Sequence, residues 1–190
     1  LLVTLESVDF RISTIQGGGL RNAIPRESAC NFVIDPNDFE FFKESIVNEM
    51  TRVQAEHRTT DPDLIWELTE SAEHVTEVMS EEEQELLLLA IQACPVGIHR
   101  MSPEIEGLVQ TSNNLAQVEV GNGLVSLRCL CRSSVDSEKD DHARSIASSF
   151  ALAGLETAYG GSYPDWTPNP NSDVVSLFKD LYEEQFGESP

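Results

Sequence analysis

The sequence is organised around one glycine-rich stretch, which reads Gly17-Gly18-Gly19-Leu20-Arg21-Asn22-Ala23-Ile24-Pro25-Arg26-Glu27. Successive glycines accept positive φ angles and let another backbone or a ligand approach closely, while Pro25 fixes its own φ and drives Ile24 toward an extended conformation. Arg21 and Asn22 form a polar tip, where a guanidinium and an amide can bind a carboxylate or a peptide carbonyl. The alternative is a hairpin loop with a capping asparagine, which needs no ligand.

Two segments that read as β-strands flank this loop. Residues 4–12 alternate apolar and polar side chains, which is the period of a half-buried strand. Residues 28–34 are short, apolar and partly β-branched, which is also typical of a strand. The glycine-rich stretch is therefore a shaped loop between two strands, with its polar residues at the tip.

Composition predicts a folded, cytoplasmic domain and excludes two classes of partner. The 190 residues are 40% hydrophobic, which supports a sizeable core. The net charge of -21 excludes nucleic acid and anionic membrane surfaces as partners, because phosphates would be repelled. No apolar run approaches the ~20 residues of a membrane span. Leu1 has neither an initiator methionine nor a basic leader, so we interpret it as the cut end of a longer protein.

Four segments have the apolar spacing of helices. They are residues 36–59, 80–93 and 138–152, and a tail helix after Ser172. The first begins with Asp35 as cap and Pro36 at its first position, and its stripe of Phe39, Phe42, Ile46, Met50 and Val53 predicts core packing. Ser80 opens a capping box with Glu83, and Asp136 is expected to cap the third helix.

The remaining segments predict further strands and an α+β fold. We expect strands over 64–69 and 155–159. Residues 98–133 are expected to form three antiparallel strands: an irregular one over 98–109, one over 114–120, and one over 124–133 after a hairpin turn at Gly121-Asn122-Gly123. The order strand, turn, strand, helix then occurs twice, over residues 4–59 and 114–154. This predicts an antiparallel sheet with helices layered on one face, a two-layer sandwich of ferredoxin-like repeated units. No sequence identity between the two units supports an internal duplication.

The pattern G-G-x-x-x-N-A-I-P-R-E-x-A resembles the lid-domain loop of zinc-dependent aminoacyl-histidine dipeptidases, bacterial carnosinase-like enzymes of the co-catalytic zinc peptidase superfamily. Four more landmarks follow in that family's order and at about its spacing. They are CPVGIHR at 94–100, TSNNL at 111–115, CLCRSSVDS at 129–137 and YPDWTP at 163–168. The resemblance covers nearly the whole chain, although residues 38–92 match by pattern more than by identity.

The resemblance implies a domain organisation and a parent activity. Residues 1–159 would be the lid and dimerisation domain, and residues 160–190 the linker and first helix of the returning catalytic domain. The parent would be a zinc metallodipeptidase, a hydrolase that cleaves aminoacyl-histidine and other dipeptides. Its implied partners are the dipeptide substrate, the missing catalytic domain and a second copy of the chain in a homodimer.

The residues of a two-zinc peptidase site are not recognisable in this sequence. Such a site needs histidine and carboxylate ligands, a water position and a glutamate base. His57, His74, His99 and His142 lack H-x-x-x-H or H-x-D spacing, so we expect each at the surface. Residues 81–83 are three glutamates that read as a helix cap. We therefore expect zinc in the parent enzyme, with no metal, no catalytic residue and no catalysis in this chain alone.

The candidate substrate-binding residues are Asn22, Arg132 and Arg128. Strand alternation places Cys129 and Cys131 toward the core as reduced thiols, so Arg128 and Arg132 point the other way. The resemblance implies that Arg132 holds the dipeptide's terminal carboxylate, with Arg128 as its rival, and that Asn22 lies near the scissile group. In simpler relatives the arginine lies on the strand directly after the glycine loop. A surface salt bridge is the alternative for either arginine.

Two functions remain open on the sequence. One is a substrate-positioning lid and dimerisation region of a cytoplasmic zinc dipeptidase. The other is a non-enzymatic α+β module, either a small-molecule regulatory domain or an acidic oligomerisation domain, in which the glycine loop is only a turn. Motifs of the H-x-D, Glu-Glu and H-S-G type directly upstream in the parent gene would decide between the two functions.

Overall fold

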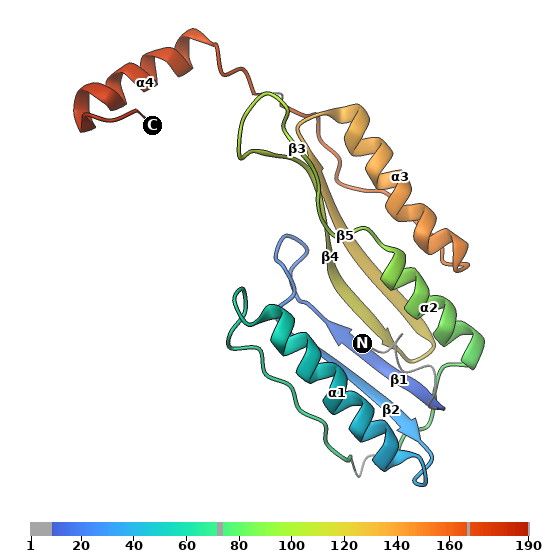
Figure 1. The fold of residues 1–190 in the computed structure, drawn as a ribbon. Helices are drawn as coiled ribbons and strands as arrows, with labels where there is room; N and C mark the ends of the chain where they lie inside the picture. The colour runs from blue at the N-terminus through green and yellow to red at the C-terminus, as the bar shows by residue number, and fades with distance from the viewer. Residues whose placement is uncertain (1–8, 72–73, 167, 190) are drawn as a thin grey trace. The chain divides into compact units, whose positions relative to one another are not determined.

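The computed structural model describes residues 9–71, 74–166 and 168–189. In chain order its elements are β1 (Phe10–Gly17), β2 (Ser28–Ile34), α1 (Phe39–His57), α2 (Glu81–Ala93), β3 (Gly97–Met101), β4 (Val109–Gly121), β5 (Leu124–Ser133), α3 (Asp136–Leu152) and α4 (Asp173–Phe186) (Figure 1). The strands form one antiparallel sheet in the order β2-β1-β4-β3, and β5 also pairs with β4. The predicted α+β fold class is confirmed.

The chain divides into two compact units. The first contains the residues up to Cys94 together with 114–130 and 147–157, and the second contains 95–113, 131–146 and the residues from 158 onward. The predicted boundary between residues 159 and 160 stays a prediction. Residues 4–8 of the first predicted strand, and Thr167 of the 163–168 motif, lie outside the described residues.

The core of the first unit lies between the β1–β2 hairpin and α1 (Figure 1). Phe10 and Ile12 of β1 are buried against Phe42 and Ile46 of α1. Phe32 of β2 completes an aromatic cluster, with its ring centroid 4.8 Å from that of Phe42. The predicted apolar stripe of the first helix is therefore confirmed as core at Phe42, Ile46 and Met50, because residues three or four apart return to the same helix face.

Two predicted strands and the predicted start of one helix are wrong. Residues 64–69 and 155–159 are not strands. Trp66 and Leu68 do alternate with exposed neighbours and pack against the α1 core, but no strand pairs with their backbone. The first helix begins at Phe39 rather than at residue 36, because Asp35 instead closes a turn: its side-chain oxygen Oδ1 accepts from the backbone N–H of Asn37 at 2.8 Å.

Two predicted caps have different outcomes. Ser80 is the N-cap of α2, and its hydroxyl accepts from the backbone N–H of Glu83 at 3.3 Å, which is one of the two bonds of a capping box. The Glu83 carboxylate accepts from the Ser80 hydroxyl at 2.7 Å. Asp136 is already the first residue of α3, so it is not the cap that the sequence predicted. Its carboxylate binds the ammonium of Lys139 one turn along the helix and accepts from the backbone N–H of Asp165.

The hairpin that joins β4 to β5 follows the prediction. Asn122 and Gly123 have φ angles of 53° and 70°, the left-handed pair that a type I′ turn requires. The order strand, turn, strand, helix therefore does occur twice, as β1-β2-α1 and as β4-β5-α3. Because a type I′ turn follows the natural strand twist, this short connection aligns the two long strands without an intervening loop.

In the second unit, Glu138 of α3 attaches the helix to two strands. Its carboxylate accepts from the guanidinium of Arg100 at 2.9 Å and from the amide of Gln110 at 2.6 Å, and it also binds the hydroxyl of Thr111. These donors, with Gln110 and Thr111 contributing most and Arg100 less, lower the pKa of the Glu138 carboxyl to about 2. Glu138 is therefore ionised at neutral pH and fixes the register of α3 against β3 and β4.

The tail helix α4 begins and ends as predicted. Ser172 caps it by accepting from the backbone N–H of Val175, and Gly187 closes it in the left-handed conformation. None of its side chains is buried, and a row of large apolar residues is exposed along it: Val174, Leu177, Phe178, Leu181, Tyr182 and Phe186. Within the part of the chain that the structure describes, no helix is long and apolar enough to cross a membrane.

Gln84 of α2 closes the free edge of β1. Its amide oxygen accepts from the backbone N–H of Ile12 at 2.7 Å, and its amide nitrogen donates to the carbonyl of Phe10 at 3.1 Å. The carbonyl of Ile12 accepts from Met79 at 2.8 Å. On the edge of β1 that faces away from β2, β4 pairs only with residues 15–17. At residues 10–12 of that edge, Gln84 takes the place of a neighbouring strand.

Replacing Gln84 with Leu should destabilise the chain. The change keeps a similar volume but leaves the buried N–H of Ile12 without a partner and removes a donor from the carbonyl of Phe10, which keeps the Arg11 guanidinium at 3.0 Å. We therefore expect a loss of about 1–3 kcal/mol in the free energy of unfolding. Urea denaturation followed by circular dichroism measures this loss. The matched control is Gln92→Leu, at an exposed position of the same helix, which should change the stability by less than about 0.5 kcal/mol. Equal effects of the two substitutions would contradict the role given to Gln84.

Candidate functional site

The glycine loop is closed at its base and pressed against β4. Strand β1 continues to Gly17, and the backbone N–H of Gly18 donates to the carbonyl of Glu27 at 3.1 Å, so the loop proper is residues 18–27. Gly18 has a φ of +72°, and a Cβ atom there would lie 1.9 Å from the carbonyl oxygen of Ala116. Only glycine fits at this position, because any side chain would collide with the β4 backbone.

Two side-chain amides of β4 hold the loop on either side of its tip. The Asn114 amide nitrogen donates to the carbonyl of Ala23 at 2.6 Å. The Gln117 amide nitrogen donates to the carbonyl of Gly19. Within the loop, the N–H of Ala23 also donates to the carbonyl of Leu20 at 3.0 Å, which forms the turn that carries the tip. The tip is thus held by hydrogen bonds to its backbone, and its side chains remain available.

The three predicted binding residues are all exposed. Asn22 lies at the loop tip and Arg128 on β5, both in the first unit, while Arg132 lies on β5 in the second unit. None of the three side chains forms a hydrogen bond or an ion pair with another of the described residues. The sequence prediction that these side chains face outward is confirmed, and their role in binding stays a prediction.

The outward direction of Arg132 follows from its neighbour. Cys131 is half-buried, and its thiol lies 3.7 Å from the carbonyl of Lys139 in α3. Because successive side chains of a strand point to opposite faces, Arg132 points away from α3. All four cysteines are free thiols, and burial raises the pKa of the Cys30 thiol to about 11, which makes that thiol unreactive at neutral pH.

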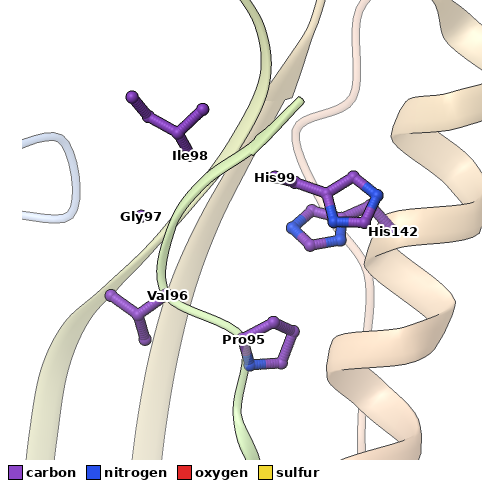
Figure 2. A pocket seen from close by; sticks show the side chains of 6 residues that line it. All are labelled: Pro95, Val96, Gly97, Ile98, His99 and His142. Atoms are coloured by element: carbon purple, nitrogen blue, oxygen red, sulfur yellow. The ribbon is translucent and has the colours of Figure 1, made fainter. Parts of the chain in front are cut away.

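His142 is buried, so the prediction that every histidine lies at the surface is wrong for this residue. Its side chain is 3% exposed because it lies on the inner face of α3, one turn before the buried Ile146. The ring stacks on that of His99 from β3, with centroids 4.1 Å apart, and both line a cavity of about 150 Å³ together with residues 95–98 (Figure 2). The Nε2 atom of His142 has no hydrogen-bond partner among the described residues.

The surroundings of His142 favour the neutral ring. Burial contributes most, and the nearby His99 adds to it, so the pKa of His142 is lowered. The carboxylates of Glu138 and Asp141 act in the opposite direction without reversing the shift. The neutral ring of His142 therefore packs on His99 much as an apolar side chain would. Protonation of His142 would bury a charge at Nε2, which has no hydrogen-bond acceptor among the described residues.

The buried histidine predicts a pH dependence of stability. The pKa of His142 in the folded state lies below the ordinary histidine value of about 6.5, so the unfolded chain takes up this proton first as the pH falls. The stabilisation is complete above about pH 6.5 and is lost as the pH falls toward the folded pKa. His142→Val should reduce the loss of stability between about pH 7.5 and pH 5, measured by urea denaturation at each pH. The control His57→Val, at the exposed end of α1, should leave that loss unchanged.

The described residues do not offer a metal site. Among residues 9–71, 74–166 and 168–189, no three histidine, cysteine, aspartate or glutamate side chains come together in a way that could hold a metal ion. A second hollow of about 670 Å³ lies in the first unit, bordered by residues 76–79, 120–125 and 153–155. Asn22, Arg128 and Arg132 line neither this hollow nor the histidine cavity.

Sequence reasoning missed Asn114, Gln117 and the histidine pair. Asn114 belongs to the TSNNL landmark, so its position was visible in the pattern, but its contact with the loop was not. Gln117 has no signal of its own in the sequence. For His99 and His142, a separation of 43 residues conceals the contact, which only the packing of α3 on β3 creates.

Comparison with known proteins supports a dipeptidase relationship. No family model matches the sequence. The chain is 30% identical over 185 residues to the cytosol non-specific dipeptidase of Escherichia coli (strain K12), an alignment that covers 97% of this chain and 38% of that protein. Its fold matches the crystal structure of the aminoacylhistidine dipeptidase from Vibrio alginolyticus with a TM-score of 0.90 and 31% identity, again over 97% of this chain and 38% of that one. The chain is therefore homologous to a segment of these dipeptidases and spans 38% of their length, which confirms the resemblance.

Proposed function

We propose that this chain is the substrate-positioning lid and dimerisation region of a cytoplasmic zinc dipeptidase that cleaves aminoacyl-histidine and other dipeptides. The observation that carries the proposal is the match to an aminoacylhistidine dipeptidase, with a TM-score of 0.90 over 97% of the chain. Since the chain spans only 38% of that protein, the remainder of a parent enzyme would supply the catalytic domain. No observation favours the alternative of a non-enzymatic regulatory or oligomerisation module.

The proposed substrate contacts use side chains that the fold leaves available. The chain has 33 acidic and 12 basic residues, so a surface arginine has many potential carboxylate partners within the protein. Four arginines do form such ion pairs: Arg11, Arg52, Arg100 and Arg144. Arg128 and Arg132 pair with no described carboxylate, and a guanidinium is well suited to bind the terminal carboxylate of a dipeptide through two parallel hydrogen bonds.

Asn22 is proposed to contact the reacting carbonyl. It lies at the exposed tip of a loop whose backbone is fixed by hydrogen bonds at Gly18, Gly19 and Ala23. The main chain of Asn22 can therefore be held in place while its side-chain amide remains accessible. An amide donor directed at a carbonyl can stabilise the negative charge that develops on the oxygen during hydrolysis. The closed lid would then hold the substrate at both its carboxylate and its scissile group.

Kinetics of the complete enzyme should separate the two roles. Arg132→Ala or Arg132→Lys should lose the bidentate pair and lower kcat/KM by an amount equivalent to about 2–4 kcal/mol, with unchanged zinc content. Asn22→Ala should lower mainly kcat, by about 100-fold, as the loss of one oxyanion donor does. Arg58→Ala, at the exposed end of α1, is the control and should leave both parameters within about twofold.

The same experiment can refute the assignments. If Arg132→Ala leaves kcat/KM within about threefold while Arg128→Ala abolishes it, Arg128 is the carboxylate ligand and the choice of Arg132 is wrong. If neither arginine affects kcat/KM, the role of this region in substrate recognition is wrong. Steady-state assays with an aminoacyl-histidine dipeptide provide all of these values.

We also propose that the catalytic zinc is held entirely outside these 190 residues. The described histidine, cysteine and carboxylate side chains do not converge in a set that could bind zinc, so the described part of the chain does not fit a zinc site. The isolated chain, incubated with about micromolar zinc and dialysed, should retain well below one equivalent of zinc and hydrolyse no dipeptide. Stoichiometric zinc by atomic emission spectroscopy would contradict this prediction.

The tail helix has a place in the proposed architecture. Residues 160–190 would return the chain to the catalytic domain, and the exposed apolar residues of α4, among them Leu177 and Phe178, would pack against that domain. A helix with a continuous apolar face gains stability mainly when another surface covers that face. The proposed homodimer would form through the lid and dimerisation domain, residues 1–159.

A further inference from the structure

Two side-chain amides of β4 bind the backbone of the glycine loop. Asn114 and Gln117 are three residues apart, and they reach the loop at Ala23 and at Gly19 respectively. Side chains three residues apart point to opposite faces of a regular strand, so the spacing of these two residues does not by itself predict that both contact one loop.

The base of the loop lies against the same segment. Gly18 approaches the carbonyl of Ala116 so closely that no Cβ atom could fit between them. The loop is therefore held at three points by four consecutive residues of β4, at its base by Ala116 and on either side of the tip by Asn114 and Gln117. Between the two amide contacts lie only Leu20, Arg21 and Asn22.

We propose that residues 114–117 of β4 are the platform that orders the glycine loop, with Asn114 and Gln117 as positioning residues for Asn22. This inference rests on the proposed function for its catalytic consequence, but its structural part is independent of any activity. Each amide binds a backbone carbonyl, so the contacts restrict the main chain and leave the Asn22 side chain accessible. Fixing a binding group before the substrate arrives lowers the entropy cost of the bound state.

The test uses nearly isosteric variants of the complete protein. Asn114→Asp and Gln117→Glu keep size and shape but place an oxygen where a donor amide faced a carbonyl, so each should repel the loop backbone. Gln117→Lys keeps a donor at similar reach and should retain the contact. The matched control is Glu119→Gln, an exposed position of the same strand that lies opposite Gln16 of β1.

Hydrogen–deuterium exchange of residues 19–23 reports the order of the loop without reference to activity. We expect exchange to become at least about tenfold faster in Asn114→Asp and in Gln117→Glu, and to stay unchanged in Gln117→Lys and in the control. The melting temperature, recorded alongside, identifies any variant that is unfolded. Unchanged exchange in both folded acidic variants would overturn the positioning role.

Dipeptide hydrolysis by the same variants tests the catalytic consequence. A disordered loop should lower kcat/KM at least about tenfold, mainly through kcat if Asn22 acts on the reacting carbonyl, with Gln117→Lys close to the wild type. Faster exchange together with lower kcat/KM supports the inference. Faster exchange with unchanged kcat/KM would leave the platform standing but overturn the proposed role of the loop and of Asn22 in catalysis.

Discussion

The close approach of Gly18 to the carbonyl of Ala116 is the constraint on which the first unit depends. It fixes where β1 ends, where the loop begins and which part of β4 lies beneath that loop. A backbone can approach another backbone so closely only where no Cβ intervenes and where φ can be positive. The loop is therefore attached to the sheet through its own main-chain atoms. Its tip side chains are not needed for this attachment, so they are available for binding.

Polar groups satisfy the backbone where the sheet itself does not. The Gln84 amide closes the edge of β1, while the amides of Asn114 and Gln117 bind two carbonyls of the loop. In the second unit, the carboxylate of Glu138 takes three donors from β3 and β4. These side chains contribute directed contacts to an otherwise modest apolar core, since a buried donor or acceptor without a partner costs more than a hydrogen bond contributes.

Several elements could be read from the sequence because their signals are local. The Phe39, Phe42 and Ile46 spacing, the Ser80 capping box and the left-handed turn at Asn122 depend only on neighbouring residues, and all three are observed. Residues 64–69 were predicted wrongly because alternation reports only which side chains are buried. Trp66 is indeed half-buried, but a strand also needs a partner backbone, and α1 covers this segment's apolar side instead.

The sequence by itself determined the α+β class, the hairpin elements and the outward direction of Arg132, because each follows from residue type and short spacing. Its five landmarks also resembled those of dipeptidases, and the comparisons confirm that relationship. Only the tertiary structure decided that His142 is buried against His99 and that Asn114 and Gln117 both hold the loop. Alternation along β4 would have separated these two amides, because residues three apart point to opposite faces of a regular strand. Which backbone carbonyl comes within reach of each amide depends on how the loop packs against β4, and no local pattern in the sequence records that packing.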